Sequence, residues 1–323
     1  MKTIVFSCGD INGIGPEIIV KSIKKLQDKL NIVLPIPIDV FEATLDIIGI
    51  KLSYQLFRAE NPLTSGLSII DIKSEGISPG TPTPESGRIS FESIKTAFKL
   101  VQSGVADAIV TAPISKKALG LAGINFPGHT EMFQQWCGVE YPLMTFLSDN
   151  LKCALVTIHI PVSEISDSLT TEKLQFITEK FIYSLKNDLG ISIPRVAVLG
   201  LNPHAGEEGR IGKEETEIIA PLIKTFEDDN LIGPLVPDAF FGNGTYKTFD
   251  AYIAMYHDQG LIPFKLLNFN KGVNFTAGLP IVRTSPDHGT AFDIAWKGKA
   301  DESSFFEAVK WAETIVSNRR LNG

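Results

Sequence analysis

The sequence has few cysteines, no long apolar run and no cluster of basic residues. Its only cysteines are Cys8, Cys137 and Cys153, and none forms a Cys-x-x-Cys pair. This cysteine usage is typical of a reducing compartment. It argues against a disulfide-stabilised secreted protein and predicts a cytoplasmic one. No apolar run approaches the ~18 residues of a membrane span, so no membrane partner is expected.

Acidic residues outnumber basic ones, 37 against 30, and the formal net charge is −7 at pH 7. An acidic chain without a patch of lysine and arginine is not expected to bind nucleic acid. Only three consecutive apolar residues, Ile4 to Phe6, lie near the N-terminus, too few for a signal peptide core. Hydrophobic residues make up 44% of the 323 residues and charged residues 21%. These values fit a globular protein of about two domains, at ~150 residues each.

The N-terminal segment reads as a strand, a glycine loop and a helix. Residues 2–7 are typical of a strand, residues 8–15 contain three glycines, and Pro16 and Glu17 favour a helix start. A helix N-terminus after such a loop is a candidate site for an anion or a cofactor. The spacing is not Gly-x-Gly-x-x-Gly, and no ribose-binding acid follows at the usual distance. The cofactor-binding residues are therefore not identified.

Strands and helices alternate along the rest of the chain, which predicts an α/β fold. We expect a short helix over 42–48, a helix through 91–101 ended by Gly104, a strand over 108–111, a hairpin of 143–147 with 151–160, a helix over 171–185, a strand over 196–201, and helices over 214–226 and 305–317. With a boundary near residue 127 and a returning C-terminal helix, the first domain is 1–127 plus 295–323. The second domain is 128–294.

Polar residues follow the strand over 108–111 and a further predicted strand over 251–256. After the strand over 108–111, the segment 111–117 either presents its hydroxyls and lysines to a ligand or forms a capped helix with solvated lysines. Residues 251–256 are an apolar run followed by His257, Asp258, Gln259 and Gly260, and a second apolar run over 261–264 precedes Lys265. Such strand ends are where α/β enzymes place their chemistry, although a polar strand end without function is the alternative.

All five histidines lie beside a turn or at a strand end: His129, His159, His204, His257 and His288. Three of them, His159, His204 and His257, follow predicted strands. Because strand ends converge at one edge of a sheet, these imidazoles could meet around one metal ion with an open, catalytic position. Asp258 is a candidate for orienting one ring. The alternative is that each histidine is a hydrogen-bonded bystander.

A second group of residues suits an anionic, phosphorylated substrate. Lys265, Arg283, His129 and Thr130 lie in loops or at strand ends, not on helix faces with compensating acids. Such cationic and hydroxyl groups bind phosphate and carboxylate. The alternative is that the lysine and the arginine form surface ion pairs.

Six motifs occur in order over nearly the whole chain: Gly-Asp-Ile-Asn-Gly-Ile-Gly-Pro-Glu17, Thr111-Ala-Pro-Ile-Ser-Lys, Pro127-Gly-His-Thr-Glu131, Leu201-Asn-Pro-His-Ala-Gly-Glu207, Tyr256-His-Asp-Gln-Gly260 and Arg283-Thr-Ser-Pro-Asp-His-Gly-Thr290. Together they resemble the 4-hydroxythreonine-4-phosphate dehydrogenase family of pyridoxal phosphate biosynthesis. The last three motifs in combination are highly specific.

The resemblance implies an isocitrate/isopropylmalate-dehydrogenase-like fold of two α/β domains, with the active site in a cleft between them. It also implies a homodimer, with the active site near the subunit interface and groups from both subunits contributing. The second domain would carry the metal ligands and dimer contacts. A divalent metal (Zn, Mg or Co) would be bound by His159, His204 and His257, and the substrate by His129, Thr130, Lys265, Asn274 and Arg283.

The reaction implied is the NAD(P)+-dependent oxidation of the C3 hydroxyl of 4-phosphooxy-L-threonine. The resulting β-keto acid loses carbon dioxide and gives 3-amino-2-oxopropyl phosphate. A metal ion stabilises a developing alkoxide, and the nicotinamide takes the hydride. We expect Lys265 or a metal-bound water to transfer the proton, which makes Lys265 and His257 the candidate catalytic residues.

The first glycine loop departs from the expected Pro-Gly-Glu-Pro-Ala-Gly-Ile-Gly-Pro, because here it reads Ser-Cys-Gly-Asp10-Ile-Asn12-Gly-Ile-Gly-Pro. Related enzymes act on D-threonate or D-erythronate 4-phosphate, so the exact substrate stays open. Two alternatives come from other classes. A three-histidine metal hydrolase would release product without reducing nicotinamide, and a non-catalytic binding protein would show no turnover.

Overall fold

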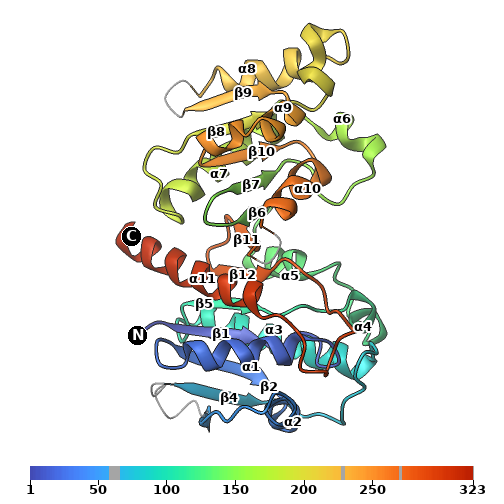
Figure 1. Cartoon of the computed structure of the whole chain (residues 1–323), viewed down its shortest axis with the longest axis vertical. Coiled ribbons are helices and arrows are strands. Elements are labelled where there is room, and N and C mark those ends of the chain that lie inside the picture. Colours follow the sequence, from blue (N-terminus) through green and yellow to red (C-terminus); the bar gives the residue numbers. More distant parts are fainter. Residues whose placement is uncertain (58–65, 227–229, 269–270, 323) are drawn as a thin grey trace. The chain divides into compact units, whose positions relative to one another are not determined.

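The computed structural model describes residues 1–57, 66–226, 230–268 and 271–322, and the chain divides into two compact units (Figure 1). Unit 1 comprises Met1–Glu140 and Leu279–Val316, and unit 2 comprises Tyr141–Gly278 and Ser317–Gly323. These bounds differ from the predicted 1–127 plus 295–323 and 128–294. Helix α5 (His129–Cys137) belongs to unit 1 because Met132 and Phe133 are buried in its core. Strand β12 (Val282–Pro286) belongs there because it pairs with β5.

Unit 1 is built on a parallel run of strands in the order β3-β4-β2-β1-β5-β12. The bounds of the first five in chain order are β1 (Thr3–Ser7), β2 (Asn31–Ile36), β3 (Tyr54–Leu56), β4 (Leu67–Asp71) and β5 (Ala108–Thr111). The strands β1 and β5 are buried throughout, as expected for parallel strands covered by helices on both faces.

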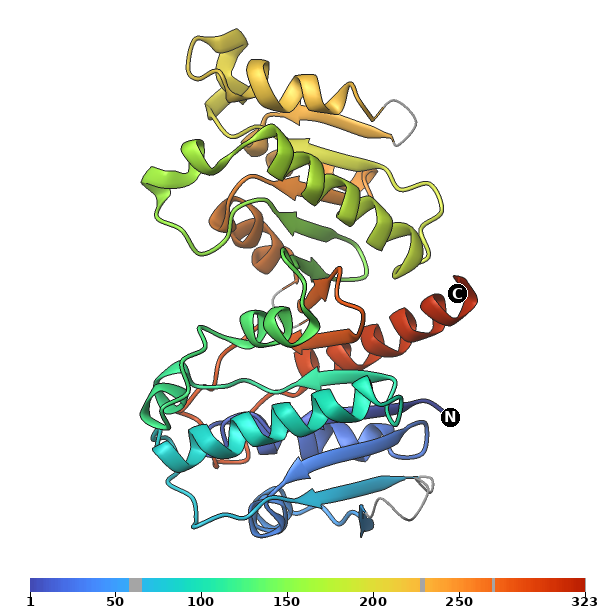
Figure 2. The same ribbon diagram turned by 180° about the vertical axis from the view of Figure 1, so that it is seen from behind.

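The helices of unit 1 cover both faces of these strands. They are α1 (Gly15–Leu26), α2 (Ile38–Ile48), α3 (Pro84–Gln102), α4 (Lys116–Leu121), α5 and the part of α11 (Ser303–Asn322) up to Val316. Figures 1 and 2 show α1 and α11 on one face and α3 on the other. Helix α3 begins before the predicted 91, because Thr83 and Ser86 form a reciprocal capping box that fixes its first turn.

Unit 2 has the strand order β11-β6-β7-β10-β8-β9. The strands β11 (Val273–Ala277), β6 (Leu143–Leu147) and β7 (Lys152–Leu155) are antiparallel neighbours, which confirms the predicted hairpin. From β7 onward the run is parallel, through β10 (Ala251–Ala254), β8 (Val196–Leu199) and β9 (Leu231–Leu235). Parallel neighbours end at the same edge, and the candidate metal ligands follow three of these strands.

The helices of unit 2 are α6 (Ile165–Ser168), α7 (Thr171–Asn187), α8 (Ala220–Ile223), α9 (Pro237–Gly242) and α10 (His257–Asn268). Figures 1 and 2 show α7 on one face of the strands and α9 and α10 on the other. The predicted helix over 214–226 is a π-helical turn, Glu215–Ile219, followed by α8. The apolar run 261–264 belongs to α10, where Leu261 and Phe264 pack onto Tyr252 and the neighbouring core.

Among the described helices, none is both long enough and apolar enough to cross a membrane.

Candidate active site

Three histidines follow three neighbouring parallel strands of unit 2. His159 follows β7, His257 begins α10 after β10, and His204 follows β8. Because β10 pairs in parallel with both β7 and β8, these strands end at one edge. The placement of the three histidines at a common sheet edge is therefore as predicted.

Two of the three imidazoles are close together. The ring centroids of His159 and His257 are 6.1 Å apart. Asp258 Oδ1 lies 2.7 Å from His257 Nδ1, so this carboxylate is placed to orient the ring, the role predicted for Asp258. Within the described residues of one chain, no group of three or more His, Cys, Asp or Glu side chains is placed to hold a metal ion. The three-histidine metal site thus stays a prediction.

The His204 loop has an unusual backbone. Five successive residues, His204 to Glu208, have φ between 43° and 77°. Left-handed conformations cost L-residues about 1–2 kcal/mol each, so other contacts must hold this turn in place. Gly206 is needed for space as well as conformation, because an added Cβ would lie 2.5 Å from Glu215 Oε2. Such strained turns occur often at functional sites.

A buried carboxylate anchors the start of this turn. Glu215 is 2% exposed, and its Oε1 accepts a hydrogen bond from the Asn202 backbone N–H at 2.7 Å. The Asn202 side-chain amide donates to Glu215 Oε2 at 3.0 Å and to Glu214 Oε2 at 2.7 Å. The residue two positions before His204 is therefore fixed at both its backbone and its side chain.

In unit 1, Arg283 is a buried cation. It is 2% exposed, and its Nε and Nη2 donate to the Thr111 hydroxyl at 3.2 and 2.7 Å. Its guanidinium also lies 5.7 Å from the centre of the Phe133 ring. Burial lowers the pKa of Arg283 to about 9, although the negative charge of Glu131 opposes the shift. A surface ion pair, the alternative raised for Arg283 above, is therefore wrong.

His129 lies beside this cation at the start of α5, next to the buried Thr130. Burial, assisted by the positive charge of Arg283, lowers the pKa of His129 well below its usual value, so the ring is neutral. The His129 Nε2 atom is buried and has no hydrogen-bond partner within the described protein. A buried polar atom of this kind is satisfied when a ligand supplies the missing group.

Two alternatives were predicted for the segment 111–117, a ligand-facing segment or a capped helix with solvated lysines, and each describes part of it. Thr111 supports Arg283, as described above. Ser115 instead caps α4 by accepting from the Ala118 N–H at 3.1 Å, and Lys116 and Lys117 are exposed. Only the first hydroxyl therefore belongs to the candidate site.

The remaining predicted site residues occupy different surroundings. Lys265 is exposed on α10, eight residues after His257, and Asn274 is partly buried on β11, opposite Phe146. His288 is exposed beyond β12. The substrate-binding roles of Lys265 and Asn274 stay predictions.

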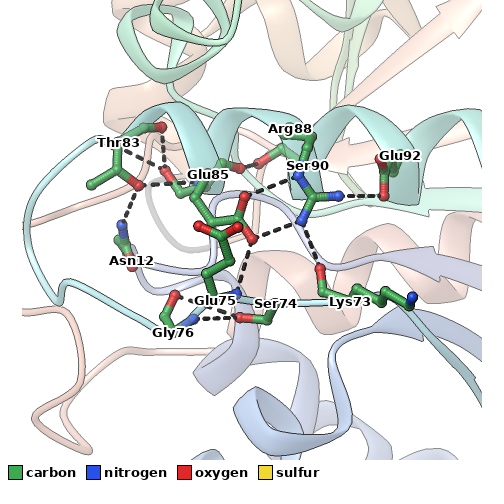
Figure 3. A network of polar contacts seen from close by, with 11 residues as sticks. Asn12, Lys73, Ser74, Glu75, Gly76, Thr83, Glu85, Arg88, Ser90 and Glu92 are labelled. Carbon is green, nitrogen blue, oxygen red and sulfur yellow. Dashed lines mark hydrogen bonds and ion pairs between the residues drawn. The ribbon is translucent and has the colours of Figure 1, made fainter.

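The two polar residues that distinguish the first glycine loop point into the protein interior. Asp10 and Asn12 are 0% and 1% exposed. Asp10 accepts from the Asn12 N–H and the Ser86 hydroxyl at 2.9 and 3.2 Å. Asn12 donates to Thr83 Oγ1 at 3.2 Å (Figure 3). It also donates to Thr81 O and accepts from the Ser78 N–H, both at 2.8 Å. These side chains join the loop to the segment 78–86.

A surface network continues from this joint along α3. Arg88 donates to both carboxylate oxygens of Glu85, at 2.9 and 2.7 Å, and to Lys73 O at 2.6 Å, and it pairs with Glu92 at 2.9 Å (Figure 3). The network ties the first turns of α3 to the segment after β4. Because α3 begins within the segment 78–86, the network also supports the segment that bonds to Asp10 and Asn12.

Comparison with known proteins decides the family. The sequence profile of the family described as "Pyridoxal phosphate biosynthetic protein PdxA" matches residues 15–312. The chain belongs to this family. The resemblance inferred from the six motifs is thus confirmed, and the protein is an enzyme of the PdxA family.

Several PdxA relatives match over their full length. The 4-hydroxythreonine-4-phosphate dehydrogenase of Prosthecochloris aestuarii is 41% identical, with 99% of each chain covered. A candidate D-threonate 4-phosphate dehydrogenase of Bradyrhizobium diazoefficiens is 39% identical, covering 98% of this chain and 97% of the relative. The crystal structure of 4-hydroxythreonine-4-phosphate dehydrogenase from Klebsiella pneumoniae has a TM-score of 0.86 and 37% identity, with 98% of each chain covered.

The fold prediction is also confirmed. The crystal structure of isocitrate dehydrogenase from Methylococcus capsulatus has a TM-score of 0.52, with 99% of this chain and 87% of that chain covered. At 15% identity this likeness concerns the fold alone.

Sequence reasoning missed the residues that hold the site in place. Glu215 gave no signal, because an acid in the first turn of a predicted helix ordinarily faces solvent. Thr111 gave a partial signal, since its hydroxyl follows a strand, but its partner Arg283 lies 172 positions along the chain. Only the fold brings these two residues together.

Proposed function

We propose that this PdxA-family enzyme oxidises the C3 hydroxyl of 4-phosphooxy-L-threonine with NAD+ or NADP+. The C3–H bond breaks, its electron pair passes to the nicotinamide as hydride, and the hydroxyl proton passes to the enzyme. The β-keto acid then loses carbon dioxide, and C2 takes up a proton to give 3-amino-2-oxopropyl phosphate. We assign the proton transfers to Lys265, which can return to C2 the proton taken from the hydroxyl.

The observation that carries this proposal is the environment of Arg283 and His129. A buried guanidinium and a neutral imidazole with an unsatisfied Nε2 lie together in unit 1. A phosphate or carboxylate would compensate the buried charge and give the ring nitrogen a partner. We therefore assign substrate binding to His129, Thr130, Lys265, Asn274 and Arg283.

A divalent metal, Zn, Mg or Co, fits the chemistry of the histidine segments. His159, His204 and His257 would hold it, and the hydrogen bond that His257 Nδ1–H donates to the Asp258 carboxylate is the support that a metal-binding imidazole usually has. When bound, such an ion withdraws charge from a hydroxyl oxygen and stabilises an alkoxide. The residues of this chain contribute by orienting the rings and by anchoring the anionic groups of the substrate.

We also propose a homodimer in which groups from both subunits complete the site. Two side chains of α10, Ile262 and Leu266, are 58% and 80% exposed, and they lie four residues apart on the helix that begins at His257. Val162, just beyond His159, is 81% exposed. Large apolar side chains gathered around a site are typical of a surface that binds a partner.

The free cysteines are consistent with a cytoplasmic enzyme.

A second candidate substrate is D-threonate 4-phosphate or D-erythronate 4-phosphate, with the same chemistry. Support comes from the Bradyrhizobium relative, whose identity to this chain, 39%, is close to that of the Prosthecochloris enzyme, 41%. The substrates differ at C2, which carries an ammonium group in 4-phosphooxy-L-threonine and a hydroxyl in the two sugar acids. The choice therefore depends on the group that receives the C2 substituent.

The deciding experiment supplies the purified enzyme with Zn²⁺, Mg²⁺ or Co²⁺, with NAD+ or NADP+, and with each of the three phosphorylated acids. We expect formation of reduced nicotinamide and release of carbon dioxide, fastest with 4-phosphooxy-L-threonine. Faster turnover of a sugar acid would favour the second candidate. Absence of nicotinamide reduction under every condition would contradict the oxidation itself.

Two variants test the metal assignment within one turn. His204→Ala should abolish turnover and weaken metal binding while leaving the circular dichroism spectrum unchanged. Glu208→Ala is the matched control, because this exposed residue has the same left-handed backbone and no assigned role. A His204→Ala enzyme with the normal rate would remove this histidine from the metal site.

A further inference from the structure

One side chain joins the His257 turn to the His204 loop. The Oε1 atom of Gln259 accepts from the Met255 N–H at 2.7 Å, and its Nε2 donates to Gly200 O at 2.7 Å. Met255 is the residue directly after β10, and Gly200 is the residue directly after β8. The two polar atoms of one amide therefore hold the ends of two strands that each lead to a histidine.

The third histidine segment is attached to the same point. The Thr157 N–H and hydroxyl both donate to Met255 O, at 3.1 and 2.7 Å. Thr157 precedes His159 by two residues, as Met255 precedes His257 by two. The backbone of Met255 is thus held on its carbonyl side by the His159 segment and on its N–H side by Gln259.

These contacts begin where the strand pairing stops. The β10–β8 register ends at Ile253 and Val198. Beyond that pair the two segments no longer pair: β10 leads into α10, and β8 leads into the left-handed turn. The Gln259 amide replaces the missing ladder bonds across this gap, because it carries both a donor and an acceptor. Neither a carboxylate nor an apolar side chain can do both.

We propose that Gln259 is a positioning residue that sets the separation between the His257 turn and the His204 loop. In this way it fixes the geometry with which the imidazoles bind a divalent cation. The inference rests on the proposed function, in which these histidines are metal ligands. Residues that position the metal ligands without touching the metal usually contribute 10- to 100-fold to metal affinity.

The test compares Gln259→Met, which keeps the length of the side chain but removes both hydrogen bonds, with Asn318→Leu. Asn318 is a matched control because its Nδ2 donates to Asp188 O, at the C-terminal end of α7 in the same unit, at 2.8 Å. Zn²⁺ and Co²⁺ affinities are measured by titration calorimetry without substrate or nucleotide, together with the visible spectrum of the Co²⁺ protein.

We expect Gln259→Met to bind Zn²⁺ about 10- to 100-fold more weakly than the parent and to shift the Co²⁺ spectrum. Asn318→Leu should lose a comparable amount of thermal stability and keep the parental affinity and spectrum. If Gln259→Met fails to fold, Gln259→Glu serves instead, because it keeps the acceptor for Met255 and places a second acceptor against Gly200 O. Parental metal affinity in the folded Gln259 variant would overturn the inference.

This outcome is distinguishable from failure of the proposed function. If the parent binds Zn²⁺ and His204→Ala does not, the histidine site stands, whatever Gln259 does. If parent and His204→Ala bind Zn²⁺ equally, the metal assignment fails first, and the role of Gln259 fails with it.

Discussion

Replacing Gly260 by alanine should disturb α10 through a single methyl group. The added Cβ would lie 2.5 Å from Leu155 Cδ2, 2.9 Å from Cys153 Sγ and 3.1 Å from Ala254 Cβ. These three neighbours are at most 1% exposed, so they cannot move into solvent. Overpacking of this kind costs about 1–3 kcal/mol. For about 2 kcal/mol the midpoint of thermal unfolding should fall by about 4–8 °C in a unit of this size.

The same substitution should also lower kcat under conditions where the variant is still folded. The backbone of α10 must move away from β10 and β7 to admit the methyl group, and His257 and Lys265 move with it. A displacement of about 1 Å at a catalytic group can cost on the order of 100-fold in rate. We therefore expect kcat to fall by at least 10-fold at a temperature where the variant is fully folded.

The assay pairs thermal unfolding with steady-state kinetics, and Gly242→Ala is the control. Gly242 ends α9 in the same unit, and apart from its chain neighbours and its own helix backbone no atom of the described residues lies within 4 Å of its added Cβ. A double variant with Leu155→Ala adds space next to the new methyl group, so its loss of stability should be smaller than the sum of the single losses by about 1 kcal/mol. Gly260→Ala with the stability and kcat of Gly242→Ala would refute the close-packing argument.

Three further substitutions test other parts of the structure. Burial raises the pKa of Asp10, so the folded protein holds this proton more tightly than the unfolded chain, and stability falls as the pH rises above the ordinary value of 3.8. Asp10→Asn should therefore be the more stable protein at pH 7 in urea unfolding, with the advantage shrinking towards pH 4. Thr111→Val removes the acceptor for two Arg283 donors, and we expect a loss of about 1–3 kcal/mol and a raised KM for the phosphorylated substrate, both restored by Thr111→Ser. Arg319→Met leaves the buried Asp188 carboxylate without its 2.7 Å ion pair, so unfolding in urea should show a loss of about 3 kcal/mol with an unchanged KM.

Local patterns were enough to predict many elements of the fold. The apolar runs predicted β1, β5, β8 and β10, and the helical periodicity predicted α1 and α7, because each buries a continuous apolar face. The resemblance supplied the arrangement that local patterns could not. Where the apolar pattern was short, as over 261–264, it did not distinguish strand from helix, and the proline at position 263 lies inside α10.

The site was predicted at the level of residue type and less well at the level of surroundings. Histidines after strands are visible in the sequence because parallel strands end at a common edge. The burial of Arg283 was not visible, since it depends on the packing of Phe133 and the position of Thr111. The left-handed turn at His204 was also missed, because four of its five residues are not glycine and carry no conformational signal.

The internal bonding of Asp10 and Asn12 bears on how sequences of the PdxA family should be sorted by substrate. Outside the loop, the hydrogen-bond partners of these two side chains are Ser78, Thr81, Thr83 and Ser86, all in one segment of the chain. Substitutions in the first glycine loop should therefore covary with substitutions at 78–86 among relatives. Grouping relatives by the sequence of that loop would separate them by how the loop packs against the segment 78–86. Enzymes with different substrates could then fall in the same group.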